Sequence, residues 1–280
     1  MTKLKAHLDN IVFSHSIFAL PFAYLGAILA AGGLPAWRDL LWVTVAMVGA
    51  RSAALALNNF IDLKYDRLHP RFTQRPMVTG AIKPHEALAF IAFSLAVFLL
   101  AAFQLHPLAR VLWPLAVIPF VVYPYMKRFS WTCHLVLGVA LAAAPVGAWI
   151  ANRGAITPPV ALLGLAVGIW IAAFDVIYGC QDVAFDKDHG LHSMPVRFGV
   201  ARALLLAKGM HVVSIAAFAA AGVIYGLGSF YYVGVAAAGG LLLYQHTIVN
   251  PGDFSRVNQR YFMRNGLVGV MIFLFTLAAI

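Results

Sequence analysis

Two short segments of this chain, residues 58–66 and 175–188, hold six of its ten acidic residues, and all six are aspartates. The chain as a whole is 62% hydrophobic. Carboxylates at or near membrane depth are costly, and they persist mainly where they pair with a cation, bind a metal or take part in chemistry. We therefore look for the function of this protein in these two segments.

Both segments repeat one spacing, in which polar side chains stand four residues apart. Residues four apart lie one above the other on a helix face, so each segment predicts a polar stripe about 12 Å long at ~1.5 Å rise per residue. The two stripes consist of Asn58, Asp62 and Asp66, and of Tyr178, Asp182 and Asp186. Asp175, two turns before Asp182, extends the second stripe inward. The repeat indicates two similar half-units with a shared site at their interface.

The chemistry that these stripes predict is the binding of a divalent cation. Two carboxylate pairs that face each other repel strongly unless a cation lies between them. The candidate ligands are oxygen atoms, without His or Cys at ligand spacing, and they suit Mg²⁺, which commonly combines one or two carboxylates with water and phosphate oxygens. We predict two Mg²⁺ ions that together clamp a diphosphate. The predicted ligands are Asn58, Asp62, Asp66, Asp182 and Asp186.

Basic residues near the two segments match the charge of a diphosphate. The predicted diphosphate-binding residues are Arg75, Lys127, Arg128 and Lys187. Lys and Arg side chains hold phosphate oxygens through charge-assisted hydrogen bonds. The alternative is that these four are ordinary basic residues of cytoplasmic loops, which membrane proteins carry for orientation.

Two tyrosines and one arginine within a predicted helix complete the set of candidates. Tyr123 and Tyr178 each fall near a predicted phosphate or metal group, and a ring face can stabilise a cation. Arg51 lies within a predicted helix, seven residues before Asn58 and on the same face. A charge at that depth needs an anionic partner, and both a substrate carboxylate and Asp175 are candidates.

The elements that position these residues are predicted to be transmembrane helices. The mean hydropathy is +0.84, only 11% of residues are charged, and long uncharged runs recur along the chain, which is typical of a polytopic membrane protein. The uncharged run from Lys208 to Asp253 is too long for one crossing, and residues 225–229 provide a turn that divides it. We predict an all-α bundle of nine transmembrane helices, with the two aspartate segments in loops over a central cavity. Residues 1–280 form one domain in this interpretation.

The basic residues also predict the orientation of the bundle. When the amino terminus is placed in the cytoplasm, fifteen of the twenty Lys and Arg residues fall on the cytoplasmic side. Only Arg38, Arg110 and Arg153 fall on the opposite side, and the positive-inside rule therefore favours this arrangement. Both aspartate segments then face the cytoplasm from the cell (inner) membrane. The net charge of +10 is spread over short loops against anionic lipid, and we expect no nucleic-acid partner.

At these residues the chain resembles the UbiA superfamily of intramembrane prenyltransferases. Residues 58–66 are similar to the first motif of the superfamily, N-[DN]-x-x-D-x-x-x-D, and residues 178–186 to the second, Y-x-x-x-D-x-x-x-D. Residues 75–80 and the stretch from Tyr123 to Arg128 also resemble family segments. The chain departs from the pattern at Asn59, where many members have Asp, and this removes one potential ligand or base.

The resemblance implies a nine-helix fold and a Mg²⁺-dependent transfer of a polyprenyl group from polyprenyl diphosphate. The stretch from Gln181 to Gly199 is most similar to the branch that prenylates aromatic acids, 4-hydroxybenzoate or a dihydroxynaphthoate, in quinone biosynthesis. In this interpretation Tyr123 and Tyr178 stabilise the allylic cation that forms from the polyprenyl group, and Asp175 accepts a proton. Arg51 and Asn58 bind the aromatic acid.

Three alternatives stay open at this point. The same fold could use a lipid glycerol phosphate or a tetrapyrrole as the acceptor. A cation-coupled transporter would also place carboxylates in membrane helices, but here both aspartate segments are expected to end in basic cytoplasmic loops. An enzyme that joins nucleotide-activated phospholipid headgroups is disfavoured, because its D-G-x-x-A-R sequence is absent.

Overall fold

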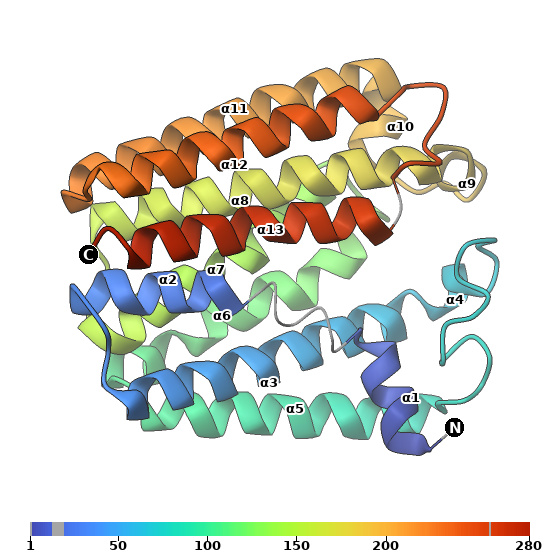
Figure 1. Ribbon diagram of the computed structural model, residues 1–280. Helices are drawn as coiled ribbons and strands as arrows, with labels where there is room; N and C mark the ends of the chain where they lie inside the picture. Colours follow the sequence, from blue (N-terminus) through green and yellow to red (C-terminus); the bar gives the residue numbers. More distant parts are fainter. Residues whose placement is uncertain (1, 13–19, 258) are drawn as a thin grey trace.

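The computed structural model describes residues 2–12, 20–257 and 259–280, with the backbone alone for residues 259 and 260. Within this part of the chain every regular element is helical, apart from one isolated bridge between Asn250 and Asp253. The helices run side by side as a bundle (Figure 1). The predicted all-α class is therefore confirmed.

Six of the described helices are long and apolar enough to cross a membrane. They are α3 (Trp37–Ile61), α5 (Pro84–Gln104), α6 (Pro107–Met126), α7 (Cys133–Arg153), α8 (Pro158–Gly179) and α11 (Val200–Tyr225). Beside them lie α2 (Leu20–Ala31), α12 (Ser229–Ile248) and α13 (Gln259–Leu277). The chain is thus a multi-pass membrane protein. The number of nine spans stays a prediction, and part of the first predicted span lies at 13–19, outside the described residues.

The ends of these helices follow from proline and glycine. Helices α5, α6 and α8 each begin with proline, whose fixed φ suits the first turn and whose missing N–H costs nothing there. Helix α7 ends at Gly154 (φ 67°) and α11 at Gly226 (φ 65°), both left-handed C-caps that favour glycine. The predicted turn at residues 225–229 is confirmed, because α11 ends at Tyr225 and α12 begins at Ser229.

Small residues allow the central helices to approach each other closely. A Cβ atom at Gly26 of α2 would lie 2.0 Å from the carbonyl oxygen of Pro145 in α7. A Cβ atom at Gly138 of α7 would lie 2.3 Å from the carbonyl oxygen of Gly168 in α8. Without a hydrophobic driving force between helices in lipid, such close backbone contact is a main source of association. Helix α7 is thereby fixed between α2 and α8.

Large apolar side chains face outward from the bundle, as expected for a protein surrounded by lipid. Phe93, Val111 and Leu205 are 66%, 71% and 70% exposed. The interior is also apolar, with Trp170 at 2% exposure in its main cluster. A surface as apolar as the core is stable only in a bilayer.

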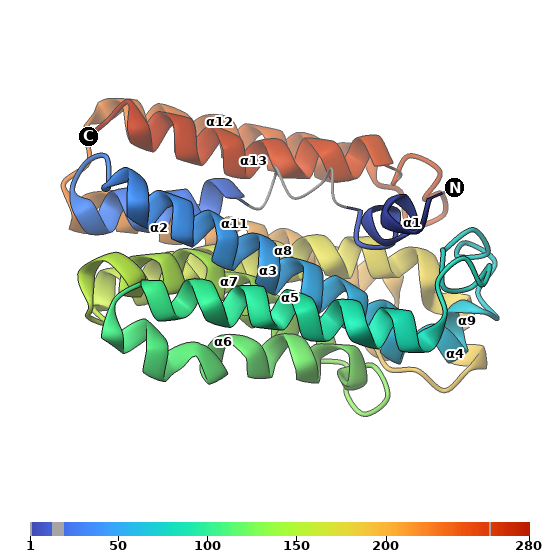
Figure 2. The same cartoon turned by 90° about the horizontal axis from the view of Figure 1, so that it is seen from below.

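Short helices gather at one end of the bundle. Here lie α4 (Leu63–Asp66), the 3₁₀ turn η2 (Cys180–Asp182), α9 (Val183–Asp188) and α10 (Met194–Phe198). Figures 1 and 2 show α4 and α9 at this same end in both views, although more than 110 residues separate them in the sequence. The amino-terminal α1 (Lys3–Asn10) lies nearby, where Lys3 pairs with Glu86 at 2.8 Å.

The aspartate stripes differ from their prediction in one respect, because neither lies on a continuous helix. Helix α3 ends at Ile61, and Asp62 is the junction to α4. Helix α8 ends at Gly179, and Asp182 is the junction between η2 and α9. The predicted straight stripes are therefore wrong in detail. The reason is local, since the backbone is non-helical at Asp62 in the first stripe and at Asp182 in the second.

Candidate active site

A small cavity of about 60 Å³, open to solvent, lies where α4, α9 and the end of α6 meet. Four carboxylates, two from each aspartate segment, line it together with basic and aromatic side chains. The lining residues are Asp62, Tyr65, Asp66, His69, Phe72, Pro124, Lys127, Arg128, Asp182, Phe185, Asp186 and Leu191. The structure thus brings together all four aspartates that the sequence predicted as metal ligands.

The two aspartate segments share one backbone feature. Asp62 has φ −87° and ψ 0°, and Asp182 has φ −103° and ψ 3°. Both fall in the sparsely populated bridge region, which many active-site residues adopt. In each segment this conformation ends one helix and starts the next, so it directs the following aspartate to the cavity.

The carboxylates of the first segment are held by two arginines. Asp66 pairs with Arg75 at 2.5 Å, and Asp62 pairs with Arg128 at 3.2 Å. Arg128 also donates to the carbonyl oxygen of Ile61 at 2.8 Å, which satisfies a free carbonyl at the end of α3. Asn58 donates to Asp62 at 3.2 Å. The predicted polar face of α3 therefore converges on Asp62.

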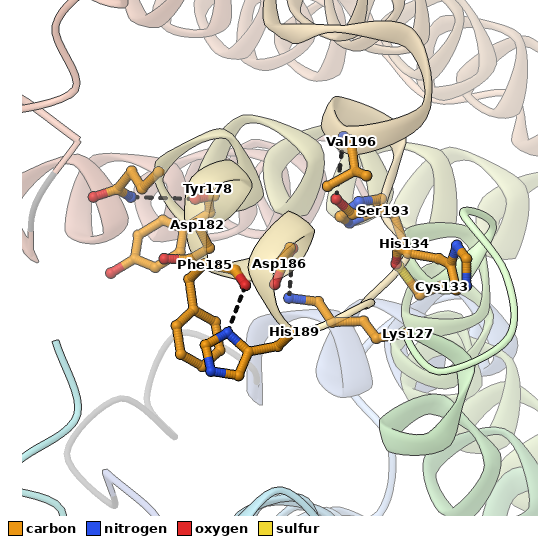
Figure 3. Close-up of polar contacts among 12 residues, drawn as sticks. Lys127, Cys133, His134, Tyr178, Asp182, Phe185, Asp186, His189, Ser193 and Val196 are labelled. Carbon is orange, nitrogen blue, oxygen red and sulfur yellow. Dashed lines mark hydrogen bonds and ion pairs between the residues drawn. The ribbon is translucent and has the colours of Figure 1, made fainter. Parts of the chain in front are cut away.

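The carboxylates of the second segment are held by residues from other parts of the chain. Arg71, from the loop after α4, contacts Oδ1 of Asp182 at 2.5 Å, and Nε2 of His69 lies 3.3 Å from the same oxygen. Nζ of Lys127, at the end of α6, lies 3.8 Å from Oδ2 of Asp186 (Figure 3). The loop after the first segment thus reaches across to the second.

The connection between α6 and α7 joins both segments. Its adjacent residues Lys127 and Arg128 pair with Asp186 and Asp62, one from each segment. The carbonyl oxygen of Lys127 accepts the N–H of His192 at 2.6 Å, which ties this connection to the loop after α9. A single dipeptide therefore sets the distance between the two halves of the cavity.

Burial shifts the ionisation of the cavity groups. Burial raises the pKa of Asp62 to about 6, although the nearby Arg128 acts against this. Burial also raises the pKa of Asp66, against the pull of Arg75. For Lys127 burial alone would lower the pKa, but the charge of Asp186 and its neighbours outweighs it, and the net shift is upward. A further cation in the cavity would therefore be stabilised by the carboxylates.

The donor atoms fit a hard divalent cation. The cavity presents carboxylate oxygens from both sides, and Oδ2 of Asp186 is buried without a hydrogen bond from any described residue. However, no group of three or more Asp, Glu, His or Cys side chains among the described residues is already close enough to hold a metal. Each carboxylate is instead paired with Arg, Lys or His. Metal binding therefore requires some of these pairs to exchange.

Three predicted residues lie beside the cavity without lining it. Lys187 is exposed on α9. The ring of Tyr178 lies 5.3 Å from the guanidinium carbon of Arg71. Oδ2 of Asp175 accepts a hydrogen bond from Nδ1 of His134 at 2.6 Å, so the described partner of Asp175 is this histidine and not a cavity residue.

Two further predicted residues lie within the helices. Tyr123 lies in the last turn of α6, four residues before Lys127. Arg51 is half-buried in α3, about 16 Å along the helix from Asp62 at ~1.5 Å per residue, and does not line the cavity. The structure therefore brings the aspartates, Arg75, Lys127 and Arg128 together and leaves Arg51 and Lys187 outside this group.

Sequence reasoning missed Arg71 and His69. Both belong to the polar stretch that continues from Asp66: His69 is the third residue after it and Arg71 the fifth. His69 is 5% exposed and lies between the rings of Phe72 and Phe185, at 4.4 and 4.3 Å. The basic and aromatic residues of this loop were the one signal in the sequence that pointed to a functional role. The pairing of His69 and Arg71 with Asp182 depends on how the loop folds.

The sequence matches the UbiA prenyltransferase family over residues 19–267. The chain belongs to this family. It is therefore a membrane prenyltransferase, and the resemblance deduced from the two aspartate motifs is confirmed.

Named relatives within the family come from bacteria. The 4-hydroxybenzoate octaprenyltransferase of Saccharophagus degradans is 32% identical over 247 residues, which cover 88% of this chain and 82% of the relative. The enzyme of the same name from Alkalilimnicola ehrlichii is 33% identical over 250 residues, 89% of this chain and 84% of the relative. These similarities extend over nearly the whole chain.

Solved structures of UbiA family members share the fold. The apo structure of a UbiA homolog from Aeropyrum pernix K1 superposes with a TM-score of 0.85 at 34% identity, covering 95% of this chain and 98% of that one. A UbiA homolog from Archaeoglobus fulgidus, solved with GPP and Mg²⁺, has a TM-score of 0.72 at 19% identity, covering 98% and 99%. The second likeness concerns the fold alone.

Proposed function

We propose that this protein transfers a polyprenyl group from polyprenyl diphosphate to an aromatic acid, with 4-hydroxybenzoate as the first candidate acceptor. One observation carries the proposal: four aspartates from two distant segments line a single cavity together with Lys127 and Arg128. Family membership and the names of the relatives support this reaction class. The single domain spans residues 1–280.

The metal ligands in this proposal are the carboxylates of both segments. Asp62 and Asp66 serve from one side, and Asp182 and Asp186 from the other, with Asn58 orienting Asp62. When bound, Mg²⁺ neutralises the diphosphate and acts as a Lewis acid on the leaving group. We propose two ions because each segment offers its own pair of carboxylates.

The basic residues exchange carboxylate for phosphate oxygens when the substrate binds. Arg75, Lys127 and Arg128 already pair with carboxylates of the cavity, and in this proposal they neutralise the charge that develops on the leaving diphosphate. Arg71 joins them in this role, and Lys187 would have to approach from its exposed position on α9.

Carbon–oxygen cleavage yields diphosphate and an allylic cation, which needs shielding from water. Tyr123 and Tyr178 offer ring faces to this cation. The electron-rich acceptor ring attacks through the carbon ortho to its hydroxyl, and the ring proton that is then lost passes to Asp175. Arg51 binds the acceptor carboxylate deeper in the bundle.

The acceptor and the orientation are the finer parts of the proposal. A dihydroxynaphthoate, a lipid glycerol phosphate and a tetrapyrrole are alternative acceptors for this fold. The transporter alternative is set aside, since the family is one of prenyltransferases. We propose that the cavity end faces the cytoplasm from the inner membrane, on the basis of the basic residues gathered there.

The decisive experiment is an assay of the purified protein in liposomes. It is incubated with Mg²⁺, a polyprenyl diphosphate and each acceptor in turn: 4-hydroxybenzoate, a dihydroxynaphthoate, a glycerol phosphate lipid and a tetrapyrrole. The proposal expects a prenylated 4-hydroxybenzoate by mass spectrometry and release of diphosphate. A product only with the lipid or tetrapyrrole acceptor would contradict the acceptor assignment. Absence of any product would contradict the reaction.

A further inference from the structure

His69 is a buried imidazole that connects the two aspartate segments. It belongs to the loop after α4, yet its Nε2 lies 3.3 Å from Oδ1 of Asp182 in η2. The residue is 5% exposed and lines the cavity. No other described histidine contacts one of the four cavity aspartates.

The hydrogen-bond pattern fixes which nitrogen of His69 carries the proton. The backbone N–H of Arg71 donates to Nδ1 at 3.2 Å. A nitrogen that accepts a hydrogen bond carries no proton, so the neutral imidazole has its N–H at Nε2. This assignment places a donor on the side of the ring that faces Asp182.

Two aromatic rings fix the orientation of the imidazole. Phe72, from the same loop, stacks on it at 4.4 Å and 25°, and Phe185 of α9 packs against it at 4.3 Å and 58°. Figure 3 shows Phe185 beside Asp182 and Asp186, with His189 on the ring of Phe185. One ring comes from the loop after α4 and the other from α9, and together they restrict rotation of the imidazole.

The contacts of Asp182 leave one of its oxygens for another ligand. Both Arg71 and His69 approach Oδ1, and Oδ2 takes part in neither contact. The N–H of His69 is not yet well aligned with Oδ1, which Arg71 holds at 2.5 Å. A buried N–H without an aligned acceptor is unfavourable, so His69 gains a full hydrogen bond if Arg71 leaves Oδ1 when a cation binds to Asp182.

We propose that His69 is a positioning residue for Asp182: its Nε2–H holds Oδ1 and thereby presents Oδ2 to the divalent cation. This inference rests on the proposed function, because it assumes a metal at Asp182. Partners that orient metal ligands in this way typically change metal affinity by about 10–100-fold when they are removed. His69 acts through Asp182 and need not touch the substrate.

The test measures Mn²⁺ binding to the purified full-length protein by electron paramagnetic resonance, without diphosphate. His69→Phe keeps a ring between Phe72 and Phe185 but lacks the donor, and Mn²⁺ affinity should fall about 10-fold. His69→Gln keeps an N–H donor and should restore most of the affinity. His189→Phe is the matched control, because His189 stacks on the same Phe185 ring at 3.9 Å. This variant should bind Mn²⁺ like the wild type.

The outcomes separate this inference from the proposed function. If the wild type binds no Mn²⁺, the metal-dependent function fails. If the wild type binds Mn²⁺ and a folded His69→Phe protein binds it equally well, the positioning role is overturned. A loss seen only after diphosphate is added also overturns it, because His69 would then contact the substrate. His69→Leu, a second donor-free variant, replaces His69→Phe if thermal unfolding shows that the latter does not fold.

Discussion

The two aspartate segments share a backbone design but differ in how their carboxylates are held. The backbone bends at Asp62 in the first segment and at Asp182 in the second, through nearly the same φ and ψ. The side chain of Asp62 is 26% exposed, whereas that of Asp186 is only 2% exposed. Arg75 from the first segment's own loop and Arg128 from the α6–α7 connection hold the first segment, whereas Arg71 and Lys127 both reach the second from other parts of the chain. The second segment is therefore the more buried half and the more dependent on the rest of the chain.

The first prediction tests whether both halves are needed. Asp62→Ala and Asp182→Ala should each lower kcat/KM for prenyl transfer by about 1000-fold, because a metal contributes several kcal/mol and each 1.36 kcal/mol is tenfold. Asp188→Ala is the control, an exposed acid that does not line the cavity, and it should stay near wild-type activity. Full activity in either cavity variant would mean that one segment suffices.

The second prediction concerns stability. Lys127→Met leaves the carboxylate of Asp186 buried without its cation, which costs roughly 3 kcal/mol. Arg128→Met affects the more exposed Asp62 and should cost about 1 kcal/mol. Thermal unfolding of the metal-free protein in detergent should show the larger decrease for Lys127→Met. Equal or reversed decreases would contradict the difference in burial.

The third prediction tests the cross-segment contact of Arg71. Arg71→Gln should lower kcat/KM by about 10- to 150-fold, since one charge-assisted contact is worth about 1.5–3 kcal/mol and each 1.36 kcal/mol is tenfold. Arg67→Gln, an exposed arginine four residues earlier, should change activity less than about 2-fold. If the two variants have equal activity, the contact of Arg71 with Asp182 does not contribute to catalysis.

The smallest predicted effect is a pH dependence that originates in the first segment. Since burial raises the pKa of Asp62 to about 6, a proton competes with the metal there as the pH falls. The Mn²⁺ concentration for half-saturation should rise about 4-fold from pH 7.5 to pH 5.5 for one competing proton. In Asp62→Asn binding is weaker, and this contribution to the pH dependence should disappear. An unchanged dependence in the variant would assign it to another group.

The sequence was sufficient to predict that the two segments meet. Equal spacing of their aspartates and the concentration of basic residues on one side placed both at the same end of the bundle, where the structure has them. These are properties of pattern and charge, which do not depend on exact packing. The prediction of a helical bundle followed in the same way from long uncharged runs between charged residues.

Other features depended on tertiary contacts that no local pattern encodes. The four-residue spacing of the aspartates did not indicate the breaks in the helices at Asp62 and Asp182, because a continuous helix has the same spacing. The contacts of His69 and Arg71 require the fold of the loop after α4. The rotation of α8 against α7 decides that Asp175 meets His134, and α9 leaves Lys187 exposed although it follows Asp186 directly.

The central claim is that both segments bind one metal–diphosphate unit. Crystals grown with Mn²⁺ and an unreactive thiolo analogue of a polyprenyl diphosphate would locate the metal by anomalous diffraction. We expect manganese between the segments, with at least one carboxylate ligand from Asp62 or Asp66 and one from Asp182 or Asp186. Manganese bound by one segment alone, or outside this cavity, would contradict the claim.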